Sequence, residues 1–295
     1  MRKIELVLGF KCNCRCMFCV IDRKTAAQSM STGRAVRELA QARRCGASAV
    51  DFGGGEPTLR PDLPQLVSAA VRLGYRGIGV KTNGLRLCYP DYAAQLLEAG
   101  TSLFSIPVWG ASPQEHDMLC RTEGAFDMME MGVKNVLDAG GEVESDVLLT
   151  TRTVPRLGEI LSRFSAIGVR RFQLWLFCLF GSAGHHPELQ PRMRDAGRAA
   201  AAAAARFGRR LRLSTTHIPP CFLGCHHGLY APISEQGLVV VTPGDSFPAE
   251  DSPFEAGTKP RRCRICRDSG RCGGLRREYL ERFSSREIRP MRRRR

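Results

Sequence analysis

The chain has 295 residues, of which 43% are hydrophobic, and its formal net charge is +15. This length allows one large domain with a sizeable core, or such a domain with a small appendage. No apolar run approaches the roughly 18 residues that a membrane-spanning helix needs, and the N-terminus lacks the apolar region and cleavage site of a signal peptide. We therefore expect a cytoplasmic protein whose basic surface favours anionic partners.

Strands and helices are predicted to alternate along the first two thirds of the chain. Alternating or β-branched runs predict strands, and amphipathic runs stopped by glycine predict helices. The predicted strands span residues 3–10, 49–52, 77–82, 102–107, 143–150 and 171–177, and the predicted helices span residues 32–45, 61–73, 91–99, 126–139, 157–167 and 187–207. Six β–α units in succession require a parallel α/β sheet, because parallel strands need helical crossovers. Functional residues are then expected at the carboxyl ends of the strands.

The pattern changes after about residue 215, where prolines interrupt regular structure and cysteines become frequent. The first domain is therefore predicted to span residues 1–215. A second, small domain is expected at residues 216–288, stapled by metal rather than by a large core. Residues 289–295 include five arginines and are predicted to form a basic, disordered tail.

The 13 cysteines are the most informative part of the composition. Their odd number and the cytosolic character of the chain argue against a disulfide framework, and most of them have metal-ligand spacing. Cys12, Cys16 and Cys19 follow the first predicted strand with the spacing C-x3-C-x2-C. Three thiolates hold three irons of a four-iron cluster and leave the fourth iron open, whereas ferredoxin-type clusters use four. Cys14 fits this spacing less well; the alternatives are a zinc site or a four-cysteine cluster that includes it.

A Gly-Gly-Glu-Pro motif at residues 54–57 follows the second predicted strand. This motif comes after the cysteine motif, which contains the aromatic Phe18. Together the two motifs resemble the radical S-adenosylmethionine (radical SAM) superfamily, over roughly residues 3–180. The resemblance implies a partial (β/α)6 TIM-like barrel, a [4Fe-4S] cluster on the three cysteines, and S-adenosyl-L-methionine at the open iron. The implied chemistry is reductive cleavage of that cofactor to a 5′-deoxyadenosyl radical, which removes hydrogen from a substrate C–H.

The resemblance also implies roles at the cofactor site. Gly54, Gly55 and Glu56 would hold the methionine amino group, since glycines let a backbone come close and a carboxylate suits an ammonium. Phe18 would contact the adenine, or be an ordinary core aromatic. Four further candidates come from weaker signals, each with a turn, strand or surface alternative. They are Asn83 in a turn signal, Ser105 and Thr150 for the ribose, and Arg121 for the cofactor carboxylate.

The C-terminal cysteines have the spacing C-x2-C-x5-C from Cys263 to Cys272 and are followed by two glycines. This resembles the Twitch or shortened SPASM extension, which holds a second, auxiliary [4Fe-4S] cluster. The implied ligands are Cys221, Cys263, Cys266 and Cys272, and a structural zinc on the same thiolates is the alternative.

Two thiols are left over as candidates for chemistry. Cys225 is either a substitute ligand or a hydrogen donor to a product radical. Cys178, after the sixth strand, is the rival donor or a buried apolar thiol. His217, which lies near the extension cysteines in sequence, is interpreted as a structural residue.

The substrate class is inferred from the resemblance and from the charge. Relatives with such extensions modify ribosomally made peptides, and we favour peptide crosslinking or epimerisation. The same chemistry on a small-molecule natural product is the alternative, as a sugar or aminocyclitol epimerase or dehydrogenase, or on a nucleotide-derived substrate. The positive charge favours an anionic substrate.

Two partners and two other functional classes are also considered. Because the chain begins at the first strand, we expect no fused peptide-recognition domain, and a separate partner could supply that function. A flavodoxin- or ferredoxin-type electron donor is expected. Hypotheses of another class are a non-catalytic iron–sulfur protein that binds RNA and a zinc-stapled interaction module.

Overall fold

Parallel strands alternate with helices in the structure, a computed structural model that describes residues 2–21, 27–255 and 257–292. The first seven strands are β1 (Arg2–Val7), β2 (Ala47–Gly53), β3 (Gly77–Lys81), β4 (Leu103–Val108), β5 (Val143–Leu149), β6 (Arg171–Leu176) and β7 (Arg212–Thr215). The first seven α-helices are α1 (Thr32–Arg44), α2 (Leu63–Arg72), α3 (Pro90–Glu98), α4 (Pro113–Cys120), α5 (Ala125–Asp138), α6 (Leu157–Ala166) and α7 (Met193–Phe207). The six predicted β–α units are therefore confirmed.

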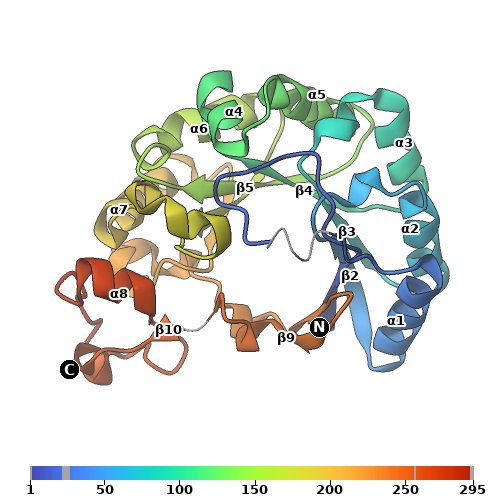
Figure 1. Cartoon of the computed structure of the whole chain (residues 1–295). Coiled ribbons are helices and arrows are strands. Elements are labelled where there is room, and N and C mark those ends of the chain that lie inside the picture. Colours follow the sequence, from blue (N-terminus) through green and yellow to red (C-terminus); the bar gives the residue numbers. More distant parts are fainter. Residues whose placement is uncertain (1, 22–26, 256, 293–295) are drawn as a thin grey trace.

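The strands form one curved sheet with the helices outside it, as Figure 1 shows. In the described residues its nine strands follow the order β7-β6-β5-β4-β3-β2-β1-β8-β9, and every neighbouring pair from β7 to β8 is parallel. The α/β class and the partial TIM-like barrel are thus as predicted.

Three elements in this region differ from the sequence prediction. The helix predicted over residues 187–207 begins only at Met193, because Pro191 forces Gln190 into an extended conformation (φ −75°, ψ 114°). The helix α4 and the strand β7 were not predicted. Both are short, at 8 and 4 residues, so their periodic pattern is weak.

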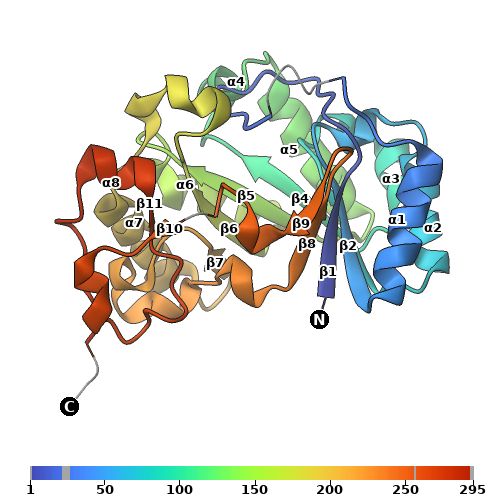
Figure 2. The same ribbon diagram turned by 60° about the horizontal axis from the view of Figure 1, so that its bottom comes forward.

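The sheet continues beyond residue 215. Strand β8 (Leu238–Val241) pairs in parallel with β1, and β9 (Ser246–Pro248) pairs with β8 in antiparallel fashion (Figure 2). The β-branched run of β8 covers the edge of β1, which would otherwise present unpaired backbone groups. The predicted boundary at residue 215 therefore does not coincide with a break in the sheet.

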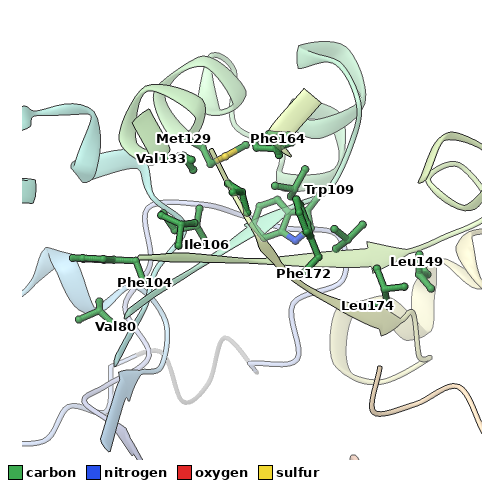
Figure 3. Close-up of a cluster of buried hydrophobic side chains, with 14 of the residues drawn as sticks. Val80, Phe104, Ile106, Trp109, Met129, Val133, Leu149, Phe164, Phe172 and Leu174 are labelled. Carbon is green, nitrogen blue, oxygen red and sulfur yellow. The ribbon is translucent and has the colours of Figure 1, made fainter. Parts of the chain in front are cut away.

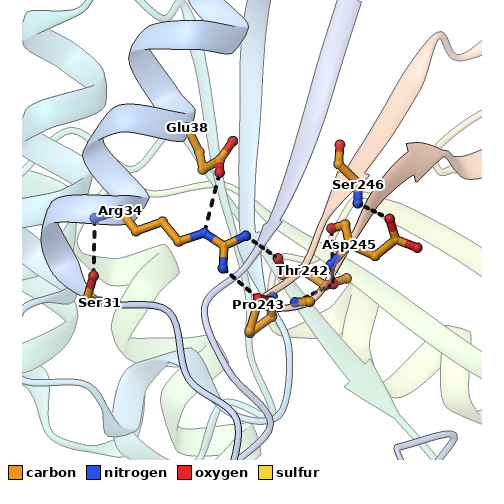
Figure 4. Close-up of polar contacts among 8 residues, drawn as sticks. Ser31, Arg34, Glu38, Thr242, Pro243, Asp245 and Ser246 are labelled. Carbon is orange, nitrogen blue, oxygen red and sulfur yellow. Dashed lines mark hydrogen bonds and ion pairs between the residues drawn. The ribbon is translucent and has the colours of Figure 1, made fainter.

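Arg34 of α1 fixes the β8–β9 hairpin to the barrel (Figure 4). Its guanidinium donates to the carbonyl oxygens of Pro243, at 2.5 Å, and Thr242, at 3.3 Å, and Glu38 pairs with it at 3.4 Å. Ser31 caps the same helix by accepting from the Arg34 backbone at 3.3 Å. One side chain thus links a hairpin to a helix more than 200 residues earlier.

The core lies between the sheet and its helices. Figure 3 shows Phe104 and Ile106 of β4 beside Met129 and Val133 of α5, all fully buried. Ser105, between the two core residues of β4, points to the opposite face because side chains alternate along a strand. The inner face of the sheet, which lines the barrel, is therefore where polar residues of the strands gather.

The remaining chain forms a small extension beside β6 and β7. It contains the two-stranded β10 (Gly257–Thr258) and β11 (Leu275–Arg276), followed by α8 (Arg277–Phe283). Tyr279 of α8 is buried and donates to Glu287 while accepting from the backbone of Met193, which joins the extension to α7. In the predicted tail, Met291 accepts from the Arg267 backbone at 2.7 Å, and residues 293–295 lie outside the described residues.

Candidate functional site

The loop with Cys12, Cys16 and Cys19 leaves the carboxyl end of β1 and is held from two sides. The backbone N–H groups of Gly55 and Glu56, after β2, donate to the carbonyls of Gly9 and Lys11 at 2.9 and 2.8 Å. On the other side, the backbones of Arg15 and Met17 donate to the last residues of α4. The unpredicted helix α4 therefore helps to position the cysteine loop.

The two glycines of the Gly-Gly-Glu motif are required by this close approach. A Cβ atom on Gly54 would lie 2.2 Å from the Gly9 carbonyl, and one on Gly55 would lie 2.3 Å from the Lys11 carbonyl. Gly54 also has a φ of 127°, which side chains rarely adopt. The glycines thus let the end of β2 lie directly on the cysteine loop.

The thiols of the loop lie close enough to influence one another. A hydrogen bond with Cys14, followed by burial, raises the pKa of Cys16, and the charges of Cys14 and Cys12 add to the shift. Burial also raises the pKa of Cys19, with a smaller contribution from Cys12. Metal ions reverse such shifts, because a bound cation stabilises thiolates. A loop of crowded thiols with this chemistry fits a cluster held by three of them.

Glu56 is buried, and its carboxylate is directed into the protein. Oε1 accepts from the Thr58 backbone at 2.9 Å, the Thr58 hydroxyl at 2.6 Å and the Thr82 hydroxyl at 2.7 Å, and Oε2 accepts from the Asn83 backbone at 2.7 Å. Burial raises the pKa of Glu56, and these hydrogen bonds counteract the rise. The carboxylate therefore joins the ends of β2 and β3, and three of its four hydrogen bonds are on Oε1.

Asn83 and Phe18 lie at the cysteine loop. The Asn83 amide donates to Asn13 at 2.7 Å and to the sulfur of Cys14 at 3.4 Å. The ring of Phe18 packs edge-on against Trp109, with centroids 4.9 Å apart. Both residues are therefore next to the predicted cluster position. The contact with Trp109 also agrees with the alternative interpretation of Phe18 as a core aromatic.

The other three cofactor candidates are placed differently. Ser105 is on the inner face of β4, between Lys81 and Glu144 in register. Arg121 is exposed at the end of α4 and contacts His186 at 3.3 Å. Thr150 is fully buried, and its hydroxyl accepts from the backbones of Arg152 and Thr153 in a turn after β5, as in its alternative interpretation as a strand threonine satisfied by backbone.

The sequence prediction missed a polar layer on the inner face of the barrel. Lys81 pairs with Glu5 at 2.5 Å and lies 3.8 Å from Asp51, which pairs with Lys3 at 2.6 Å. On β5, Asp146 accepts from the indole of Trp175 at 3.1 Å. The sequence of the strands contained a signal for this layer. Charged residues are exceptional in the strands of a parallel sheet, and they mark the face that is not packed on helices.

The pH dependence of Asp146 can be tested directly. Burial, followed by the charge of Glu144, raises the pKa of Asp146 to about 7. Because the folded pKa lies above the unfolded one, the associated stability is complete below about pH 4 and is lost as the pH rises through 7. Asp146→Asn should therefore be more stable than the wild type by about 1–3 kcal/mol at pH 8 and nearly equal at pH 4, in urea unfolding. An equal difference at both pH values would contradict this assignment.

The extension brings four of its cysteines to one small cavity. Cys221, Cys263, Cys266 and Cys272 all line it. Burial, then the charges of Cys272 and Cys266, raise the pKa of Cys221 to about 12, so these thiols are electrostatic neighbours. In their present orientations, no three His, Cys, Asp or Glu side chains of the described residues converge as metal ligands. The fit of these four cysteines to a bound cluster or metal therefore rests on the cavity that they share and on the chemistry of thiols.

The two leftover thiols differ in their surroundings. Cys225 is exposed and does not line the cysteine cavity. Cys178 is half-buried after β6; burial raises its pKa, while the nearby charge of Arg276 lowers it. Of the two, Cys178 is the thiol that the structure shields from solvent.

Comparison with known proteins decides the family. The family model described as the radical SAM superfamily matches residues 6–167, more than half of the chain. This chain belongs to the radical SAM superfamily. It is therefore an enzyme, and the family implies a [4Fe-4S] cluster and S-adenosyl-L-methionine as its cofactors. The non-catalytic hypotheses are set aside by this result.

Two kinds of radical SAM relative resemble the chain in sequence. The mycofactocin maturase MftC of Mycobacterium tuberculosis is 31% identical over 163 residues, which cover 55% of this chain and 41% of MftC. A probable GTP 3′,8-cyclase of Saccharolobus solfataricus is 30% identical over 138 residues, which cover 46% of this chain and 44% of the cyclase. The matches thus span less than half the length of these relatives.

Solved radical SAM structures share the fold at low sequence identity. SuiB of Streptococcus suis bound to its precursor peptide SuiA has a TM-score of 0.70 and 16% identity, covering 84% of this chain and 59% of SuiB. The enzyme anSMEcpe with bound AdoMet and the Cp18Cys peptide has a TM-score of 0.63 and 15% identity, covering 85% of this chain and 74% of anSMEcpe.

None of the helices in the described ranges has the length and apolar character to cross a bilayer.

Proposed function

We propose that Cys12, Cys16 and Cys19 hold the catalytic cluster and that the backbone of residues 54–56 binds the methionine moiety of S-adenosylmethionine. When bound, these cofactors supply the 5′-deoxyadenosyl radical that removes hydrogen from a substrate C–H. The role of Glu56 is to fix the ends of β2 and β3 rather than to contact the cofactor. Supporting this, four hydrogen bonds already occupy its carboxylate.

The favoured substrate is a peptide, which the enzyme crosslinks or epimerises. The observation that carries this proposal is the shared fold with SuiB bound to a precursor peptide, which extends over 84% of the chain. The fold shared with peptide-bound anSMEcpe supports it as well. The net charge of +15 suits an acidic peptide.

The extension is proposed to be Twitch- or SPASM-like and to hold a second [4Fe-4S] cluster. Its ligands would be the four cysteines that share one cavity. In an epimerisation, Cys178 would be a better hydrogen donor to the product radical than Cys225. A donor must remain a protonated thiol, and burial raises the pKa of Cys178. A flavodoxin- or ferredoxin-type protein would supply the electrons.

The substrate class can be tested by deuterium transfer. The reconstituted enzyme, with dithionite and S-adenosylmethionine, is incubated under anaerobic conditions with perdeuterated peptides. Mass spectrometry of 5′-deoxyadenosine should then show one added deuterium, because the radical takes its hydrogen from the substrate. Parallel incubations use deuterated sugars or deuterated GTP in place of the peptides. Deuterium transfer from either of these, and none from peptides, would mean that the substrate is not a peptide.

A nucleotide-derived substrate is the second candidate, because a probable GTP 3′,8-cyclase is 30% identical to part of the chain. The matched part covers 44% of that protein, so its reaction is not transferred by the match alone. In the same assay, deuterium transfer from GTP would support this candidate.

A further inference from the structure

A cavity of about 260 Å³ lies between the barrel edge and the extension. Its walls include Leu176 and His217, from the ends of β6 and β7, and Arg276 from β11. Cys272 lines both this cavity and the smaller one with the four extension cysteines. The space is thus large enough for one amino-acid side chain and is adjacent to the proposed auxiliary cluster.

The walls of this cavity contain unused hydrogen-bonding capacity. Nδ1 of His217 and Oε1 of Gln190 are buried and have no hydrogen-bond partner among the described residues. Buried polar atoms are nearly always paired, directly or through water. Two such atoms in the walls of one cavity point to a polar occupant rather than to a packing space.

Arg276 supplies a positive charge to the wall of this cavity. Its guanidinium lies 3.2 Å from Nε2 of His217, and within the described ranges it has no carboxylate partner. The acids on these walls are otherwise engaged or peripheral: Glu255 contacts His217 at 3.0 Å, and Glu250 is exposed. A planar guanidinium with free N–H groups is the side chain best suited to bind a carboxylate.

Arg271 provides an internal comparison. It lines the same cavity, but Glu235 holds its guanidinium through two contacts, at 2.5 and 2.9 Å. Its guanidinium is therefore held by a carboxylate, whereas that of Arg276 has none within ion-pair distance among the described residues. The two arginines differ in the property that carboxylate binding requires.

We propose that this cavity binds a carboxylate of the substrate through Arg276. The proposal rests on the proposed peptide substrate in one respect, the source of the carboxylate, which would be an Asp or Glu side chain or the peptide C-terminus. His217 and Gln190 complete the polar walls around it. His217 thus acquires a role beyond the structural one that the sequence suggested.

Anaerobic isothermal titration calorimetry on the reconstituted full chain tests this without turnover. The probes are the peptide acetyl-Ala-Ala-Glu-Ala-Ala-amide, its Gln counterpart, and acetyl-Ala-Ala-Gln-Ala-Ala with a free C-terminus. At least one carboxylate probe should bind about tenfold more tightly than the doubly neutral one, since hydrogen bonds to charged groups are the strong ones. Which of the two does so identifies the source.

Three variants separate this site from general electrostatics. Arg276→Gln should remove the carboxylate preference, Arg276→Lys should retain part of it, and Arg271→Gln should leave it unchanged. Equal binding of all probes by the wild type, or a preference that survives Arg276→Gln, overturns the proposal, as does its loss in Arg271→Gln. Thermal unfolding and iron content of each variant show whether it is folded.

Glutarate and glutaramide distinguish failure of this proposal from failure of the proposed function. If the substrate is not a peptide, glutarate should still bind more tightly than glutaramide, and Arg276→Gln should abolish the difference. Excess S-adenosylmethionine should not compete with glutarate, because its site is placed at the cysteine loop. Competition, or no preference for glutarate, would count against the cavity itself.

Discussion

Replacing Cys12, Cys16 and Cys19 together with alanine should abolish 5′-deoxyadenosine formation and leave about four of about eight irons per chain. The remaining iron would be held by the extension cysteines, which line a separate cavity. Iron and sulfide analysis after anaerobic reconstitution, combined with the 5′-deoxyadenosine assay, measures both effects on one sample.

The converse replacement of the four extension cysteines should also remove about four irons, but 5′-deoxyadenosine should still form. A matched control is Cys88→Ala, at a half-buried thiol after β3 that belongs to neither group. Loss of all iron in either multiple variant would mean that the two groups do not bind independent clusters. Zinc bound by the extension without iron would replace the auxiliary cluster with a structural metal.

The barrel was predictable because its signals are local. Two of the predicted strands are followed directly by Gly53 and Asn83, and glycines such as Gly46, Gly74 and Gly140 end helices with positive φ. Strand β8 was not predictable in this way. Its run of four residues is short, and it joins the strands of the barrel through the edge of β1, more than 230 residues earlier.

The candidate site was predictable in position but not in detail. The spacing of the cysteines and the Gly-Gly-Glu motif placed both on consecutive β–α units, and the structure brings them into contact. The direction of the Glu56 carboxylate could not be read from the motif, because its partners Thr58 and Thr82 are ordinary threonines until the fold brings them together. Arg276 was missed for the same reason, since an arginine-rich chain gives no local signal for an unpaired one.

Replacing Glu56 with alanine should destabilise the protein by about 3 kcal/mol, because buried donors left without an acceptor cost about 1–3 kcal/mol each and the site relaxes in part. Four donors lose their acceptor, among them the hydroxyls of Thr58 and Thr82 and the backbone of Asn83. Urea unfolding of the cluster-free protein measures the loss. Glu98→Ala, at an exposed glutamate at the end of α3, is the control and should change stability by less than about 0.5 kcal/mol.

A double-mutant cycle tests whether the cost arises from the unpaired donors. Thr82→Val removes one of them, so Glu56→Ala should cost less in the Thr82→Val background than in the wild type, by about 1 kcal/mol. Additive effects would mean that the two side chains act independently. Asn83 also contacts Asn13 and Cys14, so loss of the Glu56 carboxylate should loosen the cysteine loop as well. Less iron retained on dilution of reconstituted Glu56→Ala than of Glu98→Ala would show that this buried carboxylate supports the cluster site from behind.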